Sequence, residues 1–420
     1  MDSSELKPIA GGGLLDRRLF MQKGLCFSLA AMAAGSSEAS MSSSQRLPWM
    51  REPGKAFSNY GQPSPYERRT IRWTMGNEMA PGNGVSWTPL HDLEGMITPN
   101  GLHFERHHNG VPQIDPQQHQ LLIHGLVRQA LVFDLQDLLR YPMTSCLCFV
   151  ECGGNSNAGW HRRPIQTAAG YFHGMASCSE WTGVPLRILL EEAKVKGGGK
   201  WMIAEGADAA AMNISIPLEK AFDDCILALY QNGERIRPEN GYPLRLIVPG
   251  WEGVVNVKWL RRLHITNRPT MARNETAKYT DLLPSGKARQ FSFVMDAKSL
   301  ITSPSFGQRL LEPGLYQISG LAWSGRGRIA RVEVSADGGE SWAEAELQAP
   351  VLAKCFTRFR IPWQWEGDNT VIKSRAVDES GYVQPEREAL IARRGRHGYF
   401  HYNAIVSWKI SAQGDISHVY

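Results

Sequence analysis

The stretch Phe149-Val150-Glu151-Cys152-Gly153-Gly154-Asn155 decides how the rest of this chain is interpreted. It joins an apolar, strand-like run to a pair of glycines, with one cysteine at the junction. Glycine leaves room where another group must approach the backbone closely, and a cysteine thiolate binds soft transition metals. A single cysteine is also commonly a small buried hydrophobic residue. The surrounding sequence must therefore decide whether Cys152 is a metal ligand.

Composition is typical of a globular chain with room for two domains. The 420 residues are 42% hydrophobic and 21% charged, with a formal net charge of +5. This slight basic excess argues against a nucleic-acid-binding protein, which usually has a concentrated basic face. The longest apolar run, from Gly24 to Gly35, is too short for a transmembrane helix. The 13 tryptophans and 41 glycines favour many tight turns and few long helices.

Residues 1–40 have the pattern of a twin-arginine export signal. Arg17 and Arg18 precede a mildly apolar run over residues 25–34, which contains the small residues of Ala31-Met32-Ala33. The alternative is a disordered basic tail with a chance arginine pair. The export interpretation predicts a periplasmic protein. Because twin-arginine export moves folded proteins, it also predicts a cofactor that is inserted before export.

The cysteines leave the disulfide question open. Removal of the signal would take Cys26 away and leave six of the seven cysteines. An even number in an exported protein is compatible with disulfides, but the sequence does not indicate which cysteines pair. No Cys-x-x-Cys-His motif occurs in the chain, so we expect no covalently bound c-type haem.

The chain divides into three parts after the signal. Residues 41–100, rich in Pro, Gly, Ser and Trp, predict an irregular arm over a larger body. Residues 101–288 mix strand-like and helical patterns. We expect strands at 121–123 and 244–248, and helices at 186–193 and 218–221.

Residues 289–412 predict an antiparallel β-sandwich of immunoglobulin type. Strand-length runs alternate with turn signals, and no helical period is present. The expected strands are 315–323, 329–335, 356–361 and 370–377, separated by turns at 337–339, 366–369 and 379–381. The fold class is therefore α+β.

Two common motifs are absent or out of context. Residues 325–330 fit a dinucleotide fingerprint formally, but an alternating strand pattern follows them where a helix should begin. No His-Glu-x-x-His zinc signature occurs.

Six segments in order resemble the molybdenum-cofactor sulfite oxidase family, over roughly residues 85–412. They are Phe104-Glu105-Arg106-His107-His108, the Cys152 segment, Glu205-Gly206-Ala207-Asp208 with Ser215-Ile216-Pro217-Leu218, Asn240-Gly241-Tyr242-Pro243-Leu244-Arg245 with Val248-Pro249-Gly250, Val257-Lys258-Trp259-Leu260, and the run from Val332 to Trp342. His107 stands where the family has Asn, and Asn240 where relatives carry His. The resemblance implies a mixed α/β molybdopterin domain followed by an immunoglobulin-like domain that forms a homodimer.

The resemblance also implies roles for individual residues. Cys152 would be the molybdenum ligand, because the dithiolene of a pyranopterin leaves only one thiolate for the protein to provide. Arg106, Tyr279 and Trp181 would line the substrate pocket, although a structural arginine and satisfied core aromatic residues are alternatives. The cofactor-binding residues would be Phe104, Arg106, His108, Asp208, Asn240, Arg245, Asn256 and Lys258.

One departure from the family bears on the substrate. Typical sulfite oxidases carry arginines after Cys-x-Gly-Asn, whereas Ser156 and Asn157 follow here. Fewer pocket cations weaken attraction for a free dianion. Cys152-Gly153-Gly154-Asn155-Ser156 and Gly250-Trp251-Glu252-Gly253 resemble the molybdenum subunit of the bacterial thiosulfate-oxidising (Sox) system.

That resemblance implies oxidation of sulfane sulfur held on the cysteine of a carrier protein, beside a dihaem or other c-type cytochrome subunit. The first alternative is a sulfite dehydrogenase that uses cytochrome c. A nitrate- or sulfoxide-reducing enzyme with the same cofactor is a second alternative. A non-enzymatic scaffold that has lost the cofactor is a third, because fold does not dictate function.

Overall fold

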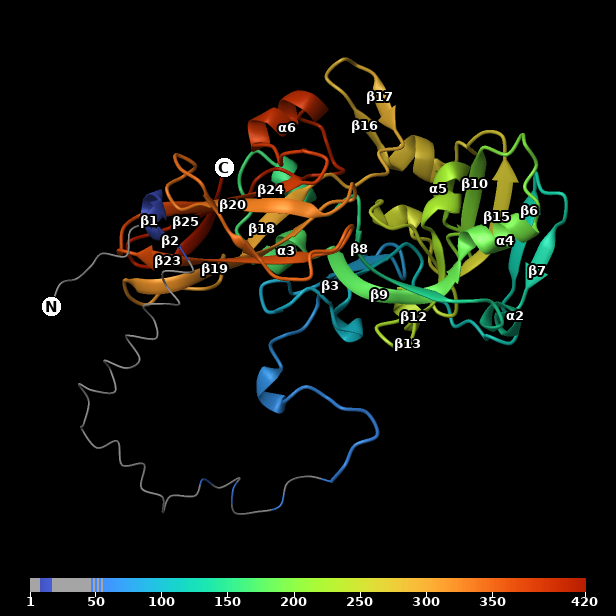
Figure 1. Ribbon diagram of the computed structural model, residues 1–420, viewed down its shortest axis with the longest axis horizontal. Coiled ribbons are helices and arrows are strands. Elements are labelled where there is room, and N and C mark those ends of the chain that lie inside the picture. Colours follow the sequence, from blue (N-terminus) through green and yellow to red (C-terminus); the bar gives the residue numbers. More distant parts are fainter. Residues whose placement is uncertain (1–7, 17–46, 48–49, 51–52, 54–55) are drawn as a thin grey trace.

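The computed structural model describes residues 8–16, 47, 50, 53 and 56–420. The arginine pair and apolar run of the predicted export signal, residues 17–34, lie outside the described residues. The described chain forms two bodies side by side, a mixed α/β body and a β-sandwich (Figure 1). No helix in the described part of the chain is long and apolar enough to cross a bilayer.

Two five-stranded sheets and one three-stranded sheet form the mixed body. The first sheet has the order β11-β10-β15-β6-β7, and the second has β13-β12-β9-β8 with β14 paired to β12. The third has the order β3-β4-β5. Their bounds are β3 Trp73–Gly76, β4 Gly84–Trp87, β5 Glu105–His107, β6 Leu121–Gly125, β7 Leu131–Phe133, β8 Thr144–Glu151, β9 Ala176–Pro185, β10 Trp201–Gly206, β11 Asn213–Pro217, β12 Ile226–Gln231, β13 Glu234–Arg235, β14 Arg245–Ile247 and β15 Leu260–Thr266.

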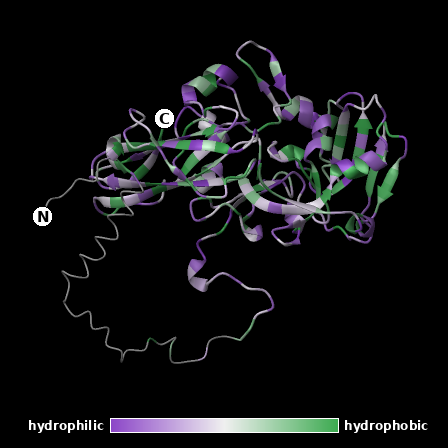
Figure 2. Cartoon of the chain, viewed as in Figure 1, coloured by the Kyte–Doolittle hydropathy of each residue, from purple (hydrophilic) through white to green (hydrophobic). Residues whose placement is uncertain are grey.

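Four short helices and a hairpin complete this body. They are α2 Leu135–Leu139, α3 Ala169–His173, α4 Leu186–Glu192 and α5 Leu218–Asp223, with the hairpin β16 Thr280–Leu282 and β17 Ala288–Gln290. In α4, Leu186, Leu189 and Leu190 are spaced along one helical face and are fully buried. The helices α4 and α5 and the strands β6 and β14 confirm the elements expected in this region. The strands of the first sheet are largely hydrophobic, as Figure 2 shows for β6 and β7.

The sandwich consists of two antiparallel sheets. One has the order β1-β2-β23-β19-β18 with β22 paired to β23, and the other has β21-β20-β24-β25-β26. Their bounds are β1 Pro8–Ala10, β2 Leu14–Leu15, β18 Lys298–Ser303, β19 Gly314–Trp323, β20 Ile329–Ser335, β21 Ala343–Glu344, β22 Glu346–Leu347, β23 Thr357–Trp365, β24 Thr370–Asp378, β25 Ser407–Ile410 and β26 Ile416–Val419. A helix, α6 Arg387–Arg394, connects β24 to β25.

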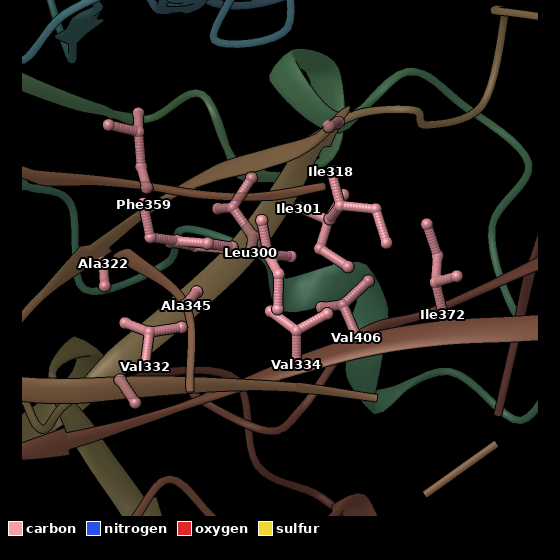
Figure 3. Packing of buried hydrophobic residues seen from close by; sticks show 14 of the residues in the cluster. Leu300, Ile301, Ile318, Ala322, Val332, Val334, Ala345, Phe359, Ile372 and Val406 are labelled. Carbon is pink, nitrogen blue, oxygen red and sulfur yellow. The ribbon is translucent and has the colours of Figure 1, made fainter. Parts of the chain in front are cut away.

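Apolar side chains from both sheets fill the space between them. Figure 3 shows Leu300 and Ile318 of one sheet close to Val334 and Ile372 of the other. Alternate residues of β20, Val332 and Val334, are fully buried, as expected for a strand with one face toward a core. The predicted α+β class and the antiparallel sandwich are confirmed.

The region from 56 to 100 is more regular than the sequence predicted. β3 and β4 pair with each other, and β4 pairs with β5, which carries Arg106. The Trp73 and Trp87 rings stack with their centroids 4.7 Å apart. The sequence pattern did not indicate these strands, because β3 and β4 are only four residues long in a region rich in Pro and Gly.

The six described cysteines are free thiols. Cys178 and Cys355 lie closest to forming a pair, with 3.3 Å between their sulfur atoms and both side chains buried.

Candidate active site

A cavity in the mixed body is lined by most of the site residues that the sequence predicted. It lies where the end of β8, β5 and the segment between β14 and β15 meet. The lining comprises Phe104, Arg106, His107, His108, Cys152, Asp208, Met212, Glu239, Arg245, Gly253, Val254, Asn256, Val257, Lys258, Trp259 and Tyr279. Nine of the eleven predicted site residues are therefore brought to one cavity from distant parts of the sequence.

Cys152 follows the last residue of β8 directly. Its backbone N–H donates to the Met175 carbonyl at 2.9 Å, and its carbonyl accepts from Asn155 N–H at 2.8 Å, which fixes the turn. Burial raises the pKa of the Cys152 thiol, although the Gly154 N–H and the Arg106 charge oppose that shift. A metal cation would favour the thiolate over the thiol at this position.

The two glycines after Cys152 are required by close neighbours. A Cβ atom on Gly153 would lie 2.7 Å from Glu252 Oε2, and one on Gly154 would lie 3.3 Å from the Tyr399 ring. The glycines therefore allow Glu252 and Tyr399 to approach the backbone beside Cys152.

Two cations face the cavity without a carboxylate partner among the described residues. Arg245 is buried and donates to the carbonyls of Asn240 at 2.9 Å and Asn256 at 3.3 Å. Burial lowers the pKa of Arg245 to about 9. Lys258 donates to His107 Nδ1 at 2.7 Å and to the Arg106 carbonyl at 3.2 Å. Burial, and then the charge of Arg245, lower the pKa of Lys258 well below its usual value.

Strand β5 supplies a third cation, Arg106, and the histidine His107, and His108 follows the strand directly. Arg106 Nη1 donates to Asn83 Oδ1 at 3.1 Å and to the His107 carbonyl. His107 bridges Lys258 to Glu105, whose Oε2 lies 2.7 Å from His107 Nε2. Burial and the Arg106 charge lower the pKa of His108 to about 4, so His108 is neutral at pH 7.

Tyr279, Asp208 and Phe104 line the remaining walls. Burial, and then the charges of Cys152 and Glu252, raise the pKa of Tyr279 well above its usual value, so its hydroxyl remains a donor. Asp208 accepts from the Met212 N–H at 3.3 Å.

Trp181 and Asn240 are placed outside the cavity lining. Trp181 is fully buried in the core beneath the cavity, and the Arg245 guanidinium lies 5.0 Å from its ring centroid. Asn240 gives its carbonyl to Arg245, while its side-chain Nδ2 donates to Gln231 Oε1 at 3.0 Å. Its Oδ1 atom is buried and has no hydrogen-bond partner in the described structure. Both residues thus contact Arg245 and not the open space.

Glu252 and His401 lie at the Cys152 turn, although no sequence motif assigned them a role. Their side chains are buried and paired, with His401 Nε2 at 3.0 Å from Glu252 Oε2. The His401 N–H donates to the Gly153 carbonyl at 2.8 Å, so this pair lies against the Cys152 turn. Glu252 belongs to the quoted Gly250–Gly253 segment, which was the available signal. His401 comes from the loop before β25, and nothing in a single sequence links it to Cys152.

A second buried ion pair supports the Cys152 turn from behind. Lys298, the first residue of β18, lies 3.1 Å from Glu151 Oε1 and 2.6 Å from Ser156 Oγ. Glu151 also accepts from Trp323 Nε1 at 2.7 Å and from Asn155 Nδ2 at 2.9 Å. The sandwich therefore fixes the residues on both sides of Cys152.

The donor set of the cavity fits a molybdenum pyranopterin. The phosphate tail of that group needs cationic and N–H donors, and Arg106, Arg245 and Lys258 are cations with no carboxylate partner in the described chain. The metal needs one thiolate from the protein, which Cys152 places in the same cavity.

Comparison with known proteins agrees with this geometry. A family model for the oxidoreductase molybdopterin binding domain matches residues 108–274, and one for the Mo-co oxidoreductase dimerisation domain matches residues 289–408. The crystal structure of the sulfane dehydrogenase SoxCD from Paracoccus pantotrophus superposes with a TM-score of 0.86 at 46% identity. That match covers 90% of this chain and 97% of the other.

Curated relatives are longer proteins. Mitochondrial sulfite oxidase of Mus musculus is 32% identical over 71% of this chain, and the NADH nitrate reductase of Ulva prolifera is 28% identical over 77%. The matched parts span 59% and 40% of the lengths of these two relatives. From the cavity, the two family models and the SoxCD likeness together, this chain belongs to the molybdopterin oxidoreductases of the sulfite oxidase type.

Proposed function

We propose that this chain is the molybdenum subunit of a periplasmic sulfane dehydrogenase. Its substrate is sulfane sulfur on the cysteine of a carrier protein, as in thiosulfate oxidation, and its electrons pass to a c-type cytochrome subunit. The observation that carries the proposal is the 46% identity with a sulfane dehydrogenase over 90% of this chain. The export pattern at Arg17-Arg18 supports the periplasmic location, and the dimerisation domain supports a homodimer.

The charges around Cys152 favour this substrate over a free dianion. Where typical sulfite oxidases have arginine, Ser156 is buried and bonded to Lys298 and His173, so it adds no cation to the cavity. The buried Glu252 carboxylate lies beside Gly153. A sulfur delivered covalently by a carrier does not depend on electrostatic attraction.

Different residues of the cavity would bind the metal, bind the anionic part of the cofactor and donate a hydrogen bond during the reaction. Cys152 would hold the metal, while Arg106, Arg245 and Lys258 would hold the anionic part of the cofactor. When bound, the molybdenum cofactor supplies two-electron oxidation of sulfur with oxygen from water. Tyr279 keeps its proton, so its hydroxyl would donate a hydrogen bond to an oxygen of the oxidised sulfur product. The Trp181 ring packs against the Arg245 guanidinium and would hold it in position.

A steady-state comparison of two substrates tests the proposal. The purified chain, matured with its cofactor, is mixed with oxidised cytochrome c and either free sulfite or a carrier protein whose cysteine holds sulfane sulfur. We expect faster cytochrome reduction with the loaded carrier, and no reduction with either substrate in the Cys152→Ser variant. Rapid reduction by free sulfite with the isolated chain would overturn the carrier-bound substrate.

The second candidate is a sulfite dehydrogenase that passes electrons to cytochrome c. The similarity to the sulfite oxidases, at 32% identity to the mouse protein, favours it. The same assay separates the two candidates, because a sulfite dehydrogenase needs no carrier and the loaded carrier would then give no rate above background.

A further inference from the structure

Two buried cysteines meet where the mixed body contacts the sandwich. Cys178 lies in β9 of the mixed body, and Cys355 lies two residues before β23 of the sandwich. Their sulfur atoms are 3.3 Å apart, and the two residues are 0% and 1% exposed. Both belong to the apolar cluster that fills the sandwich. The pair therefore lies across the junction of the two bodies, with its members 177 positions apart in the sequence.

Neighbouring contacts hold both cysteines in place. The Cys178 N–H donates to Thr98 Oγ1 at 3.1 Å, and the Thr98 N–H donates to the Cys178 carbonyl at 2.7 Å. Across the junction, the Phe149 N–H donates to the Lys354 carbonyl at 3.0 Å, and the Phe149 and Phe356 rings stack with their centroids 6.4 Å apart. A disulfide requires about 2.05 Å between its sulfur atoms, so the two side chains need to close only roughly 1.2 Å.

Cys355 can be reached by the opening of one surface loop. Residues 351–354, which precede it, form no helix or strand and are exposed or partly exposed. The loop is held by the ion pair of Lys354 with Asp224 at 2.6 Å, and these two side chains are 25% and 26% exposed. Surface loops of this kind open at a much lower free energy than the whole fold. Burial raises the pKa of the Cys178 thiol well above its usual value, so Cys355 is the thiol that reacts first.

We propose that Cys178 and Cys355 form a disulfide that fastens the mixed body to the sandwich when a disulfide oxidant is present. The Cys355 thiolate attacks one sulfur of the oxidant, such as glutathione disulfide, and one glutathione leaves as a thiol. Cys178 then attacks Cys355 Sγ in the mixed disulfide, and the second glutathione leaves as a thiol. Two electrons and two protons pass from the cysteine pair to glutathione disulfide. Oxidising conditions of this kind prevail in the periplasm, the location expected for this chain.

The bond would act on the strand that leads to the predicted metal ligand. Phe149 lies opposite Cys178 in the pairing of β8 with β9, and it stands three residues before Cys152. A disulfide from Cys178 to Cys355 would therefore join the strand pair behind Cys152 covalently to the sandwich. The bond would also close a loop across 177 positions, which restricts the unfolded chain and so stabilises the folded one.

Thiol mapping of the full chain, loaded with its cofactor, tests whether the bond forms. The chain is held in glutathione buffers of rising oxidised fraction, with urea below the unfolding midpoint to speed opening of the loop, and is then denatured, alkylated and digested. We expect one peptide pair joined through Cys178 and Cys355, and the same pair in the control Cys225→Ser, which removes another buried thiol. Recovery of both cysteines as alkylated thiols from the most oxidising buffer would overturn the proposal.

Urea unfolding of the reduced and the oxidised chain tests the effect of the bond. The oxidised chain should unfold at a urea midpoint roughly 0.5–1 M higher, because the bond restricts the unfolded chain. The shift should persist in Cys225→Ser and disappear in Cys355→Ser, which keeps a side chain of similar size but cannot form the bond. An unchanged midpoint in an oxidised chain that carries the mapped bond would overturn the conclusion that the bond fastens the two bodies.

Discussion

Two lysines inside the folded chain, Lys298 and Lys258, differ in whether a carboxylate pairs with them. Lys298 lies in the contact between the sandwich and the mixed body and is paired with the Glu151 carboxylate at 3.1 Å. Lys258 lines the cavity, and its donors go to His107 and to backbone carbonyls, with no carboxylate partner in the described chain. Burial lowers the pKa of both lysines.

The difference separates a structural pair from a binding group. A buried cation with a carboxylate partner is compensated within the folded protein, whereas one without such a partner remains available to an anionic ligand. Arg245, like Lys258, is a cation without a carboxylate partner in the described chain. The cavity therefore carries positive charge that the protein leaves uncompensated, and a molybdenum pyranopterin would supply the missing anion.

The largest expected effect comes from breaking the structural pair. Lys298→Met or Glu151→Gln alone should lower the free energy of unfolding by about 3–5 kcal/mol, because a buried charge loses its partner. The double variant should lose less than the sum of the two single variants. Urea unfolding measures each value, with Lys409→Met on the exposed side of β25 as the control. An additive double variant would contradict the proposed pairing.

Removing Lys258, which has no carboxylate partner in the described chain, should change cofactor binding more than the free energy of unfolding. Lys258→Met should leave the free energy of unfolding of the cofactor-free chain unchanged or raised. It should also weaken cofactor binding roughly 10- to 100-fold, since a charge-assisted hydrogen bond contributes about 1.5–3 kcal/mol. Cofactor content after dialysis measures the binding. A Lys258→Met chain that unfolds as readily as Lys298→Met would remove the distinction between the two lysines.

Acid should lower the free energy of unfolding through two histidines, His108 in the cavity lining and His103 next to it. Burial and then the Arg245 charge lower the pKa of His103 to about 3, and burial and then the Arg106 charge lower that of His108 to about 4. Both are neutral in the folded chain and take up protons only on unfolding as the pH falls below about 6.5. Stability is therefore lost from about pH 6.5 down to about pH 4 through His108 and down to about pH 3 through His103, by at most about 1.4 kcal/mol per pH unit for each histidine.

Urea midpoints at pH 7, 6 and 5 measure this slope. His108→Gln should reduce the slope, while the same change at the exposed His161 should not. A slope that is identical in His108→Gln and in the unaltered chain would contradict the account of the cavity charges.

The fold was predictable where a pattern is local. The strand-length runs of β19, β20, β23 and β24, bounded by turn signals, and the helical pattern of α4 can be recognised from neighbouring residues alone. Pairing between distant segments could not be recognised in this way. β3 and β4 were assigned to an irregular arm because each is only four residues long. The hairpin at residues 8–15 was assigned to the export signal, because its partner β23 lies far along the chain.

The candidate site was predictable to the extent that it resembled a known family. Motif agreement selected Cys152, Arg245 and Lys258, which the structure brings to one cavity. The same agreement selected Trp181 and Asn240, which lie beneath the lining because motif agreement does not indicate which side chain faces open space. Glu252 and His401 received no role, since their pairing depends on a contact across 149 positions of the sequence.

X-ray absorption at the molybdenum edge, on the unaltered chain and on Cys152→Ser, tests the central claim most directly. The account predicts that the variant loses one sulfur neighbour of the metal together with its turnover. An unchanged sulfur count with full activity in Cys152→Ser would contradict the account.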